Sequence, residues 1–270
     1  MYRFFIFAFC LIAACGRTVP HDARIVVAGD SVLAWNRSAE GSVSDVLQKL
    51  VKEPVGDVSL PLAQVAGGFG PLNIPRQLYG VRAQWVVVNG GANDLGINCD
   101  CSDCGAILDR LISDDGRQGA IPLLVADLRG QGARVVWADY YTSPRYAGTA
   151  CEAPYQVLED RLGRMADADS GVTLVDMDDV FSPNDLSLFD ADKTHPSAKG
   201  SARIAKLVAD ALLSEIEKFR PENAKLVLIK SKRQQTCKFT EFQRVDALQG
   251  SGEPDHERHQ GNRAFAFRLP

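Results

Sequence analysis

Short apolar runs rich in β-branched residues recur along the chain and alternate with stretches of helical spacing. The run at residues 85–89 is the clearest, because its continuous apolar character is typical of a strand buried on both faces. The run at 55–60 is weaker. All the runs that predict strands are 24–28, 55–60, 85–89, 134–138 and 172–176.

Helical spacing of apolar residues predicts four helices, at 42–51, 120–128, 155–168 and 197–219. Ser42 or Ser44 could cap the first of them, and Gly130 could end the second. The last helix carries an apolar stripe that is simply explained by packing on a core. Strands and helices in this order predict a three-layer α/β/α sandwich around a central parallel sheet. Ligands in such sheets bind beyond the carboxyl ends of the strands.

The first 15 residues are predicted to be an export signal. Arg3 provides a positive start, and Phe4–Ala14 is an apolar run of 11 residues. This is too short for a hydrocarbon core, which needs roughly 20 residues, but it suits an export signal. The run ends in Leu11-Ile12-Ala13-Ala14-Cys15, which resembles a bacterial lipobox and predicts lipidation of Cys15. An ordinary signal peptide, with Cys15 incidental, is the alternative.

We therefore expect the protein in the bacterial periplasm or cell envelope, with a lipidated N-terminus as its membrane tether. In that oxidising setting, Cys99, Cys101, Cys104 and Cys151 are disulfide candidates, and Cys237 is left over. Four cysteines allow three pairings, among which the sequence does not choose. A zinc site built from the same four thiolates is the rival interpretation.

The charge distribution divides the chain near residue 219. Residues 219–270 hold 10 Lys/Arg and 6 Asp/Glu, whereas the whole chain has a formal net charge of -4. We expect a folded domain over 22–218 and a basic, flexible tail over 219–270, in which 225–230 could form one more short strand. The acidic total provides no chain-wide basic surface, so no nucleic-acid partner is expected.

A serine follows the first predicted strand, in Gly29-Asp30-Ser31. Gly29 permits a tight turn, so Ser31 lies at the carboxyl end of the strand, next to the expected crevice. Its hydroxyl is a candidate nucleophile, and its backbone N–H could face an oxyanion. Taken alone, Gly-Asp-Ser is also a common turn sequence.

An asparagine follows the strand at 85–89, within Gly90-Gly91-Ala92-Asn93-Asp94. The Asn93 amide is an uncharged donor that can stabilise a negative oxygen without titrating. A helix cap or a turn is the simpler interpretation of Asn93 if the motif stands by itself.

A carboxylate and an imidazole lie three residues apart in Asp192-Lys193-Thr194-His195. Asp192 could accept from one ring nitrogen while the other ring nitrogen faces Ser31. His195 is one of four histidines and the single one between residues 22 and 218. Asp190 is a competing carboxylate, with a turn or helix cap as its simpler role.

Together these motifs resemble the SGNH hydrolase (GDSL esterase/lipase) superfamily, over roughly Arg24 to Ile216. The resemblance implies a flavodoxin-like α/β/α fold without metal or cofactor, and hydrolysis of esters or thioesters. It maps the nucleophile to Ser31, the acid and base to Asp192 and His195, and oxyanion donors to Ser31 and Asn93.

One motif departs from the family pattern. The position of the family's oxyanion glycine falls on Leu62, whose backbone N–H could still donate. A Cβ at that position would crowd the substrate and disfavour a positive φ. Alternatively, the loop shifts its register so that Gly67 supplies the donor. Either departure could weaken the oxyanion hole.

These features predict a serine esterase that acts on a small-molecule or glycan-linked ester by a two-step acyl-enzyme mechanism. The alternatives are a glycan O-acetyl esterase or O-acyltransferase with the same chemistry, and a non-catalytic exported binding protein on the same fold. Trp35, Phe69 and Tyr141 could line the substrate pocket, although core packing would explain each equally well.

Overall fold

The computed structural model describes residues 19–99 and 101–219. Within them, five strands form one parallel sheet in the order β2-β1-β3-β4-β5. The apolar runs predicted all five, and the weak run at 55–60 forms a strand only as far as Asp57. The strands are β1 Ile25–Ala28, β2 Val55–Asp57, β3 Trp85–Val88, β4 Arg134–Ala138 and β5 Val172–Val175.

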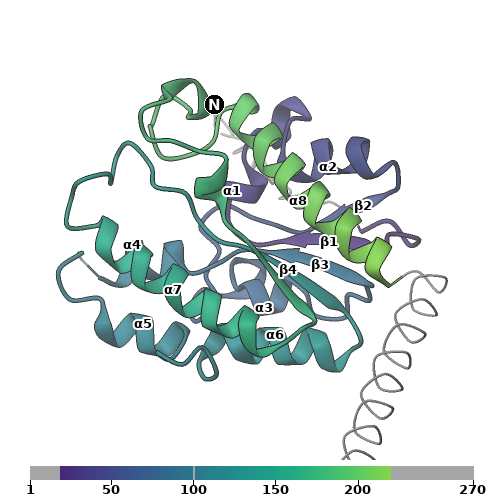
Figure 1. Ribbon diagram of the computed structural model, residues 1–270, viewed down its shortest axis with the longest axis horizontal. Helices are drawn as coiled ribbons and strands as arrows, with labels where there is room; N and C mark the ends of the chain where they lie inside the picture. The colour runs from purple at the N-terminus through teal and green to yellow at the C-terminus, as the bar shows by residue number, and fades with distance from the viewer. Residues whose placement is uncertain (1–18, 100, 220–270) are drawn as a thin grey trace, which may run out of the picture. The chain divides into compact units, whose positions relative to one another are not determined.

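Helices cover both faces of the sheet (Figure 1). Helix α2 and the first part of α8 lie on one face, and α3, α5, α6 and α7 lie on the other. This confirms the three-layer α/β/α sandwich. The α-helices are α1 Ser31–Ala34, α2 Val43–Val51, α3 Ile74–Gln77, α4 Ala92–Asn98, α5 Gly105–Leu111, α6 Ala120–Gly130, α7 Glu152–Ala168 and α8 Ala198–Lys218, and the 3₁₀ turns are η1 Arg37–Ala39, η2 Gly70–Leu72, η3 Met177–Asp179 and η4 Leu186–Leu188.

The chain divides into two units, Met1–Glu215 and Ile216–Pro270. The first unit holds the whole sheet and α8 as far as Glu215. Of the second unit, the structure describes only residues 216–219, which include the end of α8. The predicted export signal with Cys15, and nearly all of the predicted tail, lie outside the described residues.

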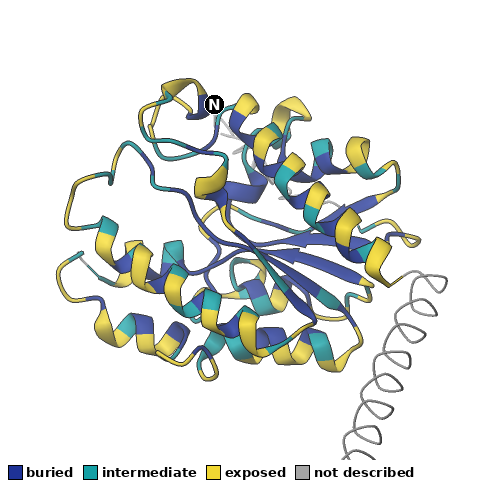
Figure 2. Ribbon diagram, in the orientation of Figure 1, coloured by how far each residue is buried: buried dark blue, intermediate teal, exposed yellow. Residues whose placement is uncertain are grey.

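The core lies between the sheet and its two helical layers (Figure 2). Strands β1 and β3 are buried along their entire length, because each is paired on both edges and covered on both faces. Helix α2 turns Val43 and Leu47 inward, and a capping box formed by Ser42 and Asp45 begins it. Of the two predicted candidates, Ser42 and Ser44, it is therefore Ser42 that caps the helix.

Gly29 allows the ends of β1 and β3 to approach closely and to be joined by hydrogen bonds. It has a φ of 140°, and a Cβ there would lie 1.9 Å from the Asn89 side-chain oxygen. That oxygen accepts the Asp30 backbone N–H at 3.0 Å, and the Asn89 amide donates to the Asp30 carboxylate at 2.8 Å. The residue after Asp30, Ser31, is therefore held firmly at the carboxyl edge of the sheet.

Two disulfides use the four predicted cysteines, Cys99 with Cys104 and Cys101 with Cys151. The second bridge joins segments 50 residues apart, the end of α4 and the start of α7. All four thiols are used in these bridges, so the zinc interpretation of these cysteines is set aside. Between residues 19 and 219, leaving out residue 100, no helix is long and apolar enough to cross a membrane.

Candidate active site

A chain of hydrogen bonds joins Ser31, His195 and Asp192. The Ser31 Oγ lies 2.9 Å from His195 Nε2, and His195 Nδ1 lies 2.5 Å from Asp192 Oδ2. Ser31 is the first residue of α1 and is only 8% exposed. The three residues that the sequence singled out, from two ends of the domain, therefore meet at one edge of the sheet.

Asp192 and His195 belong to one tight turn. The Asp192 Oδ1 accepts the backbone N–H groups of Thr194 and His195, each at 2.9 Å. Burial opposes the charge on Asp192, but the hydrogen bonds from His195 and from these backbone groups outweigh it and hold the pKa of Asp192 below its ordinary value. The carboxylate is therefore charged at neutral pH and fixes the orientation of the imidazole.

Asp30, next to Ser31, is the centre of a buried network. Its carboxylate accepts the Val32 N–H at 2.9 Å and the Tyr140 hydroxyl at 2.5 Å, in addition to the Asn89 amide. Burial raises the pKa of Asp30, and these three hydrogen bonds oppose that rise. The Tyr140 hydroxyl in turn accepts the Ala92 N–H at 3.2 Å. The network ties the ends of β1, β3 and β4 together beneath Ser31.

No role was predicted for Asn89 or Tyr140. Asn89 is the last residue of the predicted strand 85–89, and Tyr140 lies two residues after the one at 134–138, positions where polar side chains reach the crevice of a parallel sheet. That positional rule could have marked them as candidates.

Three groups are candidates for donating a hydrogen bond to an oxyanion. One is the Asn93 amide, whose nitrogen donates to the Ala63 carbonyl at 2.9 Å and has a second hydrogen available. The others are the backbone N–H groups of Ser31 and Leu62, for which the described residues provide no acceptor. Asn93 and Ser31 line the same cavity.

Leu62 has a φ of 65°, the left-handed conformation that glycine adopts most easily, and its side chain is 63% exposed. The loop therefore keeps the backbone shape expected of a glycine at this position despite the leucine. Gly67 is the weaker alternative, because its N–H is directed at the Asp94 carboxylate. The Val65 and Ala66 N–H groups bind the same carboxylate, at 2.8 and 2.9 Å.

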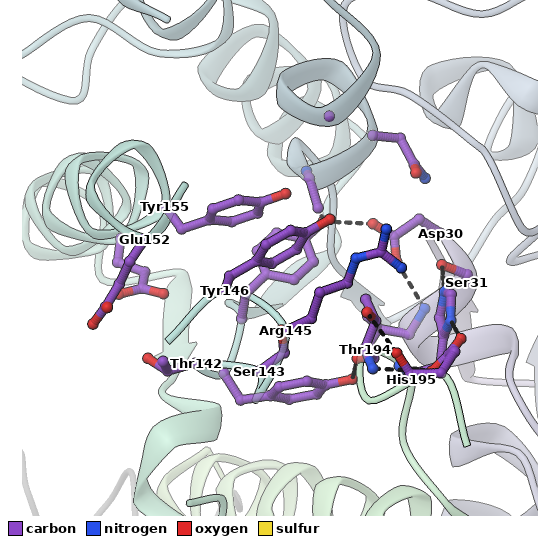
Figure 3. A pocket seen from close by; sticks show the side chains of 18 of the residues that line it. Asp30, Ser31, Thr142, Ser143, Arg145, Tyr146, Glu152, Tyr155, Thr194 and His195 are labelled. Carbon is purple, nitrogen blue, oxygen red and sulfur yellow. Dashed lines mark hydrogen bonds and ion pairs between the residues drawn. The ribbon is translucent and has the colours of Figure 1, made fainter. Parts of the chain in front are cut away.

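A cavity of about 330 Å³ opens beside Ser31 and His195 (Figure 3). Of the three aromatic residues that the sequence offered, only Tyr141 lines it. Phe69 is 79% exposed and lies outside its lining. The other lining residues combine aromatic rings, hydroxyl groups and charges, and they include Asn93, Tyr140, Ser143, Arg145, Tyr146, Tyr155, Gln156 and Glu159.

Helix α7 and the loop before it form the wall opposite Ser31. Tyr146 and Tyr155 stack with ring centroids 5.7 Å apart, and Tyr155 meets Tyr140 edge to face at 6.2 Å. Burial, with the nearby charges of Asp178 and other carboxylates, raises the pKa of Glu159 to about 8. Glu159 is therefore largely neutral at pH 7. The wall also includes Arg145 and Glu152, so it carries side chains of both charge signs.

Trp35 lies against His195 and does not line the cavity. The two rings stack with centroids 3.7 Å apart and planes within 5° of parallel. The indole N–H donates to Asp190 Oδ2 at 2.8 Å. This geometry separates the two carboxylates that competed in the sequence, since Asp192 binds His195 and Asp190 binds Trp35. Within the described ranges, no group of three or more His, Cys, Asp or Glu side chains could hold a metal ion.

Residues 27–203 match the GDSL-like lipase/acylhydrolase family, which is about two thirds of the chain. No curated protein is significantly similar to the chain in sequence.

Solved structures share the fold at low sequence identity. The crystal structure of TesA is 20% identical, with a TM-score of 0.50 over 70% of this chain and 97% of that one. The psychrotrophic esterase EstA from Pseudoalteromonas sp. is 16% identical, with a TM-score of 0.51 over 72% and 98%. A carbohydrate esterase family 2 enzyme from Corynascus thermopiles (Myceliophthora fergusii) is 17% identical, with a TM-score of 0.53 over 74% and 69%.

The predicted resemblance is therefore confirmed at the level of the family and the SGNH hydrolase fold. The chain belongs to the GDSL-like lipase/acylhydrolase family and is a hydrolase that acts on esters.

Proposed function

We propose that the protein cleaves its ester by a two-step acyl-enzyme mechanism with Ser31 as the nucleophile, His195 as the base and Asp192 as the partner of His195. The observation that carries this proposal is the continuous hydrogen-bond chain from Asp192 through His195 to the Ser31 hydroxyl. A serine hydroxyl is a weak nucleophile, and a base within hydrogen-bond reach that is itself oriented by a carboxylate is the arrangement that activates it.

In the first step, His195 Nε2 takes the Ser31 proton as Ser31 Oγ bonds to the ester carbonyl carbon. The negative oxygen that forms is stabilised by the Ser31 and Leu62 N–H groups and by the Asn93 amide. His195 then gives its proton to the alcohol as the bond to that alcohol breaks. In the second step, water attacks the acyl-Ser31 bond in the same way and releases the acid.

We propose a short acyl group on a polar alcohol, such as an ester carried by a glycan, as the substrate. The cavity supports this choice, because Ser143, Gln156 and the tyrosines give its wall hydrogen-bonding groups and its volume is small. Two structures with the same fold point in the same direction, the carbohydrate esterase family 2 enzyme and an acetyl xylan esterase from Butyrivibrio proteoclasticus. Acyl transfer to a sugar, with the sugar in place of water, is the second candidate.

We further propose export and a lipid anchor at Cys15. Two disulfides within one small domain are typical of proteins outside the reducing cytosol. Metabolic labelling with a fatty-acid probe tests the anchor. The label should attach to the wild-type protein and be absent from Cys15→Ser. Equal labelling of the two would contradict lipidation at this residue.

The decisive experiment for the chemistry replaces the nucleophile. Ser31→Ala should abolish both fluorophosphonate labelling and hydrolysis of p-nitrophenyl acetate. Ser38→Ala, at an exposed serine in η1, serves as the matched control and should keep both. Retention of activity in Ser31→Ala would refute the assignment.

The substrate is tested with esters that differ in one feature. Rates on p-nitrophenyl esters should fall as the acyl chain lengthens beyond a few carbons. O-acetylated xylo-oligosaccharides should release acetate faster than p-nitrophenyl octanoate is cleaved. The reverse order would indicate a lipid-like substrate. Formation of a new sugar ester from p-nitrophenyl acetate and a free sugar would favour the transferase.

A further inference from the structure

Trp35 lies one helical turn beyond Ser31, on the same side of α1. The Trp35 backbone N–H donates to the Ser31 carbonyl at 2.8 Å, so the helical bond that ends α1 fixes the offset between the two residues. Residues four positions apart are neighbours on a helix surface. The spacing Ser-x-x-x-Trp therefore places an indole ring beside the proposed nucleophile, where it meets the ring of His195.

The indole ring is held by the same turn that carries His195. Its N–H donates to one oxygen of Asp190, and the other oxygen of Asp190 accepts the Ala191 N–H at 2.7 Å. The Asp190 N–H donates to the His195 carbonyl at 2.8 Å. Asp190, which binds the indole, and His195, which the indole covers, therefore belong to one hydrogen-bonded turn.

His195 is surrounded by a defined set of groups. Asp192 faces Nδ1, Ser31 faces Nε2, and the Trp35 ring covers one face of the imidazole. The charges of Asp190 and of buried Asp30 act on it through space. The ring becomes a cation when it takes the Ser31 proton, and an indole face within about 6 Å attracts a cation. The contact is therefore stronger in the charged state than in the resting state.

We propose that Trp35, anchored by Asp190, is a positioning residue that keeps the His195 ring aligned between Ser31 and Asp192 and stabilises its charged form during turnover. This inference rests on the proposed function of the Ser31 site. It also gives Asp190 a role, since Asp190 fixes the indole and does not bind the imidazole itself. The indole acts through His195 and does not touch the ester.

Four variants separate positioning from simple packing. Trp35→Leu removes the ring and should lower kcat for p-nitrophenyl acetate about 10-fold with little change in KM. The acid limb of its kcat/KM profile should move to lower pH, because the charged form of the imidazole loses support. Trp35→Phe keeps a ring on the imidazole and should restore most of kcat. The kcat of Asp190→Ala should lie between those of Trp35→Leu and Trp35→Phe. The kcat of Asp190→Asn should be higher than that of Asp190→Ala, because asparagine keeps an acceptor for the indole N–H.

A merely structural role would lower the melting temperature of Trp35→Leu and leave its pH profile and kcat unchanged. That result, with active sites counted by fluorophosphonate titration, would overturn the inference. Phe69→Leu is the matched control, since Phe69 is exposed and lies outside the cavity. It should keep the wild-type profile.

The two proposals fail in different ways. If wild-type protein shows no Ser31-dependent hydrolysis, the proposed mechanism fails. If it does, and the Trp35→Leu profile still superimposes on that of the wild type, only the role of Trp35 fails. Should Trp35→Leu not fold, the exposed Asp190 decides the matter, because equal kcat values for Asp190→Ala and Asp190→Asn would refute the anchor.

Discussion

The backbone at Leu62 keeps the shape of a glycine. A φ of 65° costs an L-residue about 1 to 2 kcal/mol, and the exposed leucine side chain recovers little of this by burial. Leu62→Gly should therefore be more stable than Leu62→Ala. The free energy of unfolding, measured with urea, should differ by about 0.5 to 1 kcal/mol after the chain entropy of glycine is deducted. Both variants lose the side chain, so their difference isolates the backbone strain. A less stable glycine variant would contradict this account.

Asn93 is the side-chain donor of the proposed oxyanion hole. Its amide is fixed by the Ala63 carbonyl, so it needs no reorganisation when charge develops on the ester oxygen. Asn93→Ala should lower kcat about 100- to 1000-fold, measured with p-nitrophenyl acetate, and should leave KM nearly unchanged. Asn184→Ala, at an exposed site outside the cavity, is the control. A loss below about 10-fold in Asn93→Ala would assign the oxyanion to the backbone donors alone.

At the residue scale, sequence alone indicated Ser31, Asn93 and His195, because each stands in a motif next to a strand end or turn and His195 is the single histidine between residues 22 and 218. Asp192 was assigned as the partner of His195 through the family resemblance, with Asp190, two residues away in the same turn, as a competing carboxylate. Only the three-dimensional path of that turn shows which carboxylate meets the imidazole. Trp35 was a candidate for the pocket lining, with core packing as the alternative, and nothing in the sequence indicated that its ring stacks on His195.

At the scale of elements, the strands and long helices could be predicted because each has enough residues to show its period. The predicted helices at 120–128 and 155–168 begin within three residues of α6 and α7. Helices α1, α3, α4 and α5 were not predicted. Helix α1 has four residues, which is barely one turn, so no apolar periodicity can develop. Its cap is Asp30, whose carboxylate accepts the Val32 N–H and is held in place by Asn89 and Tyr140, which are distant in the sequence.

The two disulfides constrain the segments around the cavity unequally. In the chain-entropy relation, the bridge between Cys101 and Cys151, 50 residues apart, contributes about 4 kcal/mol. The bridge between Cys99 and Cys104, five residues apart, contributes about 2 kcal/mol. The double variant Cys101→Ser with Cys151→Ser should therefore melt at a clearly lower temperature than Cys99→Ser with Cys104→Ser.

That comparison is made by thermal unfolding under non-reducing conditions, with dithiothreitol-treated wild type as the reference. Both double variants should keep hydrolysis at a temperature well below unfolding, because neither bridge touches the Ser31 hydroxyl. If the two melted at the same temperature, loop closure would not be the source of the stability.

For the whole molecule, the alternation of strands and helices predicted a parallel sheet with two helical layers but not the order of its strands. The order β2-β1-β3-β4-β5 places Ser31, Asn93 and the loop after β4 at one edge, around the point where the chain reverses its direction across the sheet. The flavodoxin-like order came only through the family resemblance, since no local pattern specifies which strands are neighbours.

Two carboxyl groups, the buried Asp139 and the half-buried Glu159, link the stability of the whole domain to pH. Burial, with nearby carboxylates, raises the pKa of Asp139 from 3.8 to about 8 and the pKa of Glu159 from 4.5 to about 8. Between these ordinary values and pH 8, the folded protein binds protons that the unfolded chain has released. The free energy of unfolding should therefore fall as pH rises through this window and level off above it.

Each group contributes a slope of at most about 1.4 kcal/mol per pH unit, and Glu159 contributes less because it is partly exposed. The glutamine of Glu159→Gln cannot ionise. In urea unfolding at pH 5, 6, 7 and 8, its free energy of unfolding should therefore fall less steeply with pH than that of the wild type, and it should be the more stable protein at pH 8. Glu40→Gln, at an exposed turn, should reproduce the wild-type slope. Parallel curves for Glu159→Gln and the wild type would show that Glu159 ionises without penalty in the folded protein.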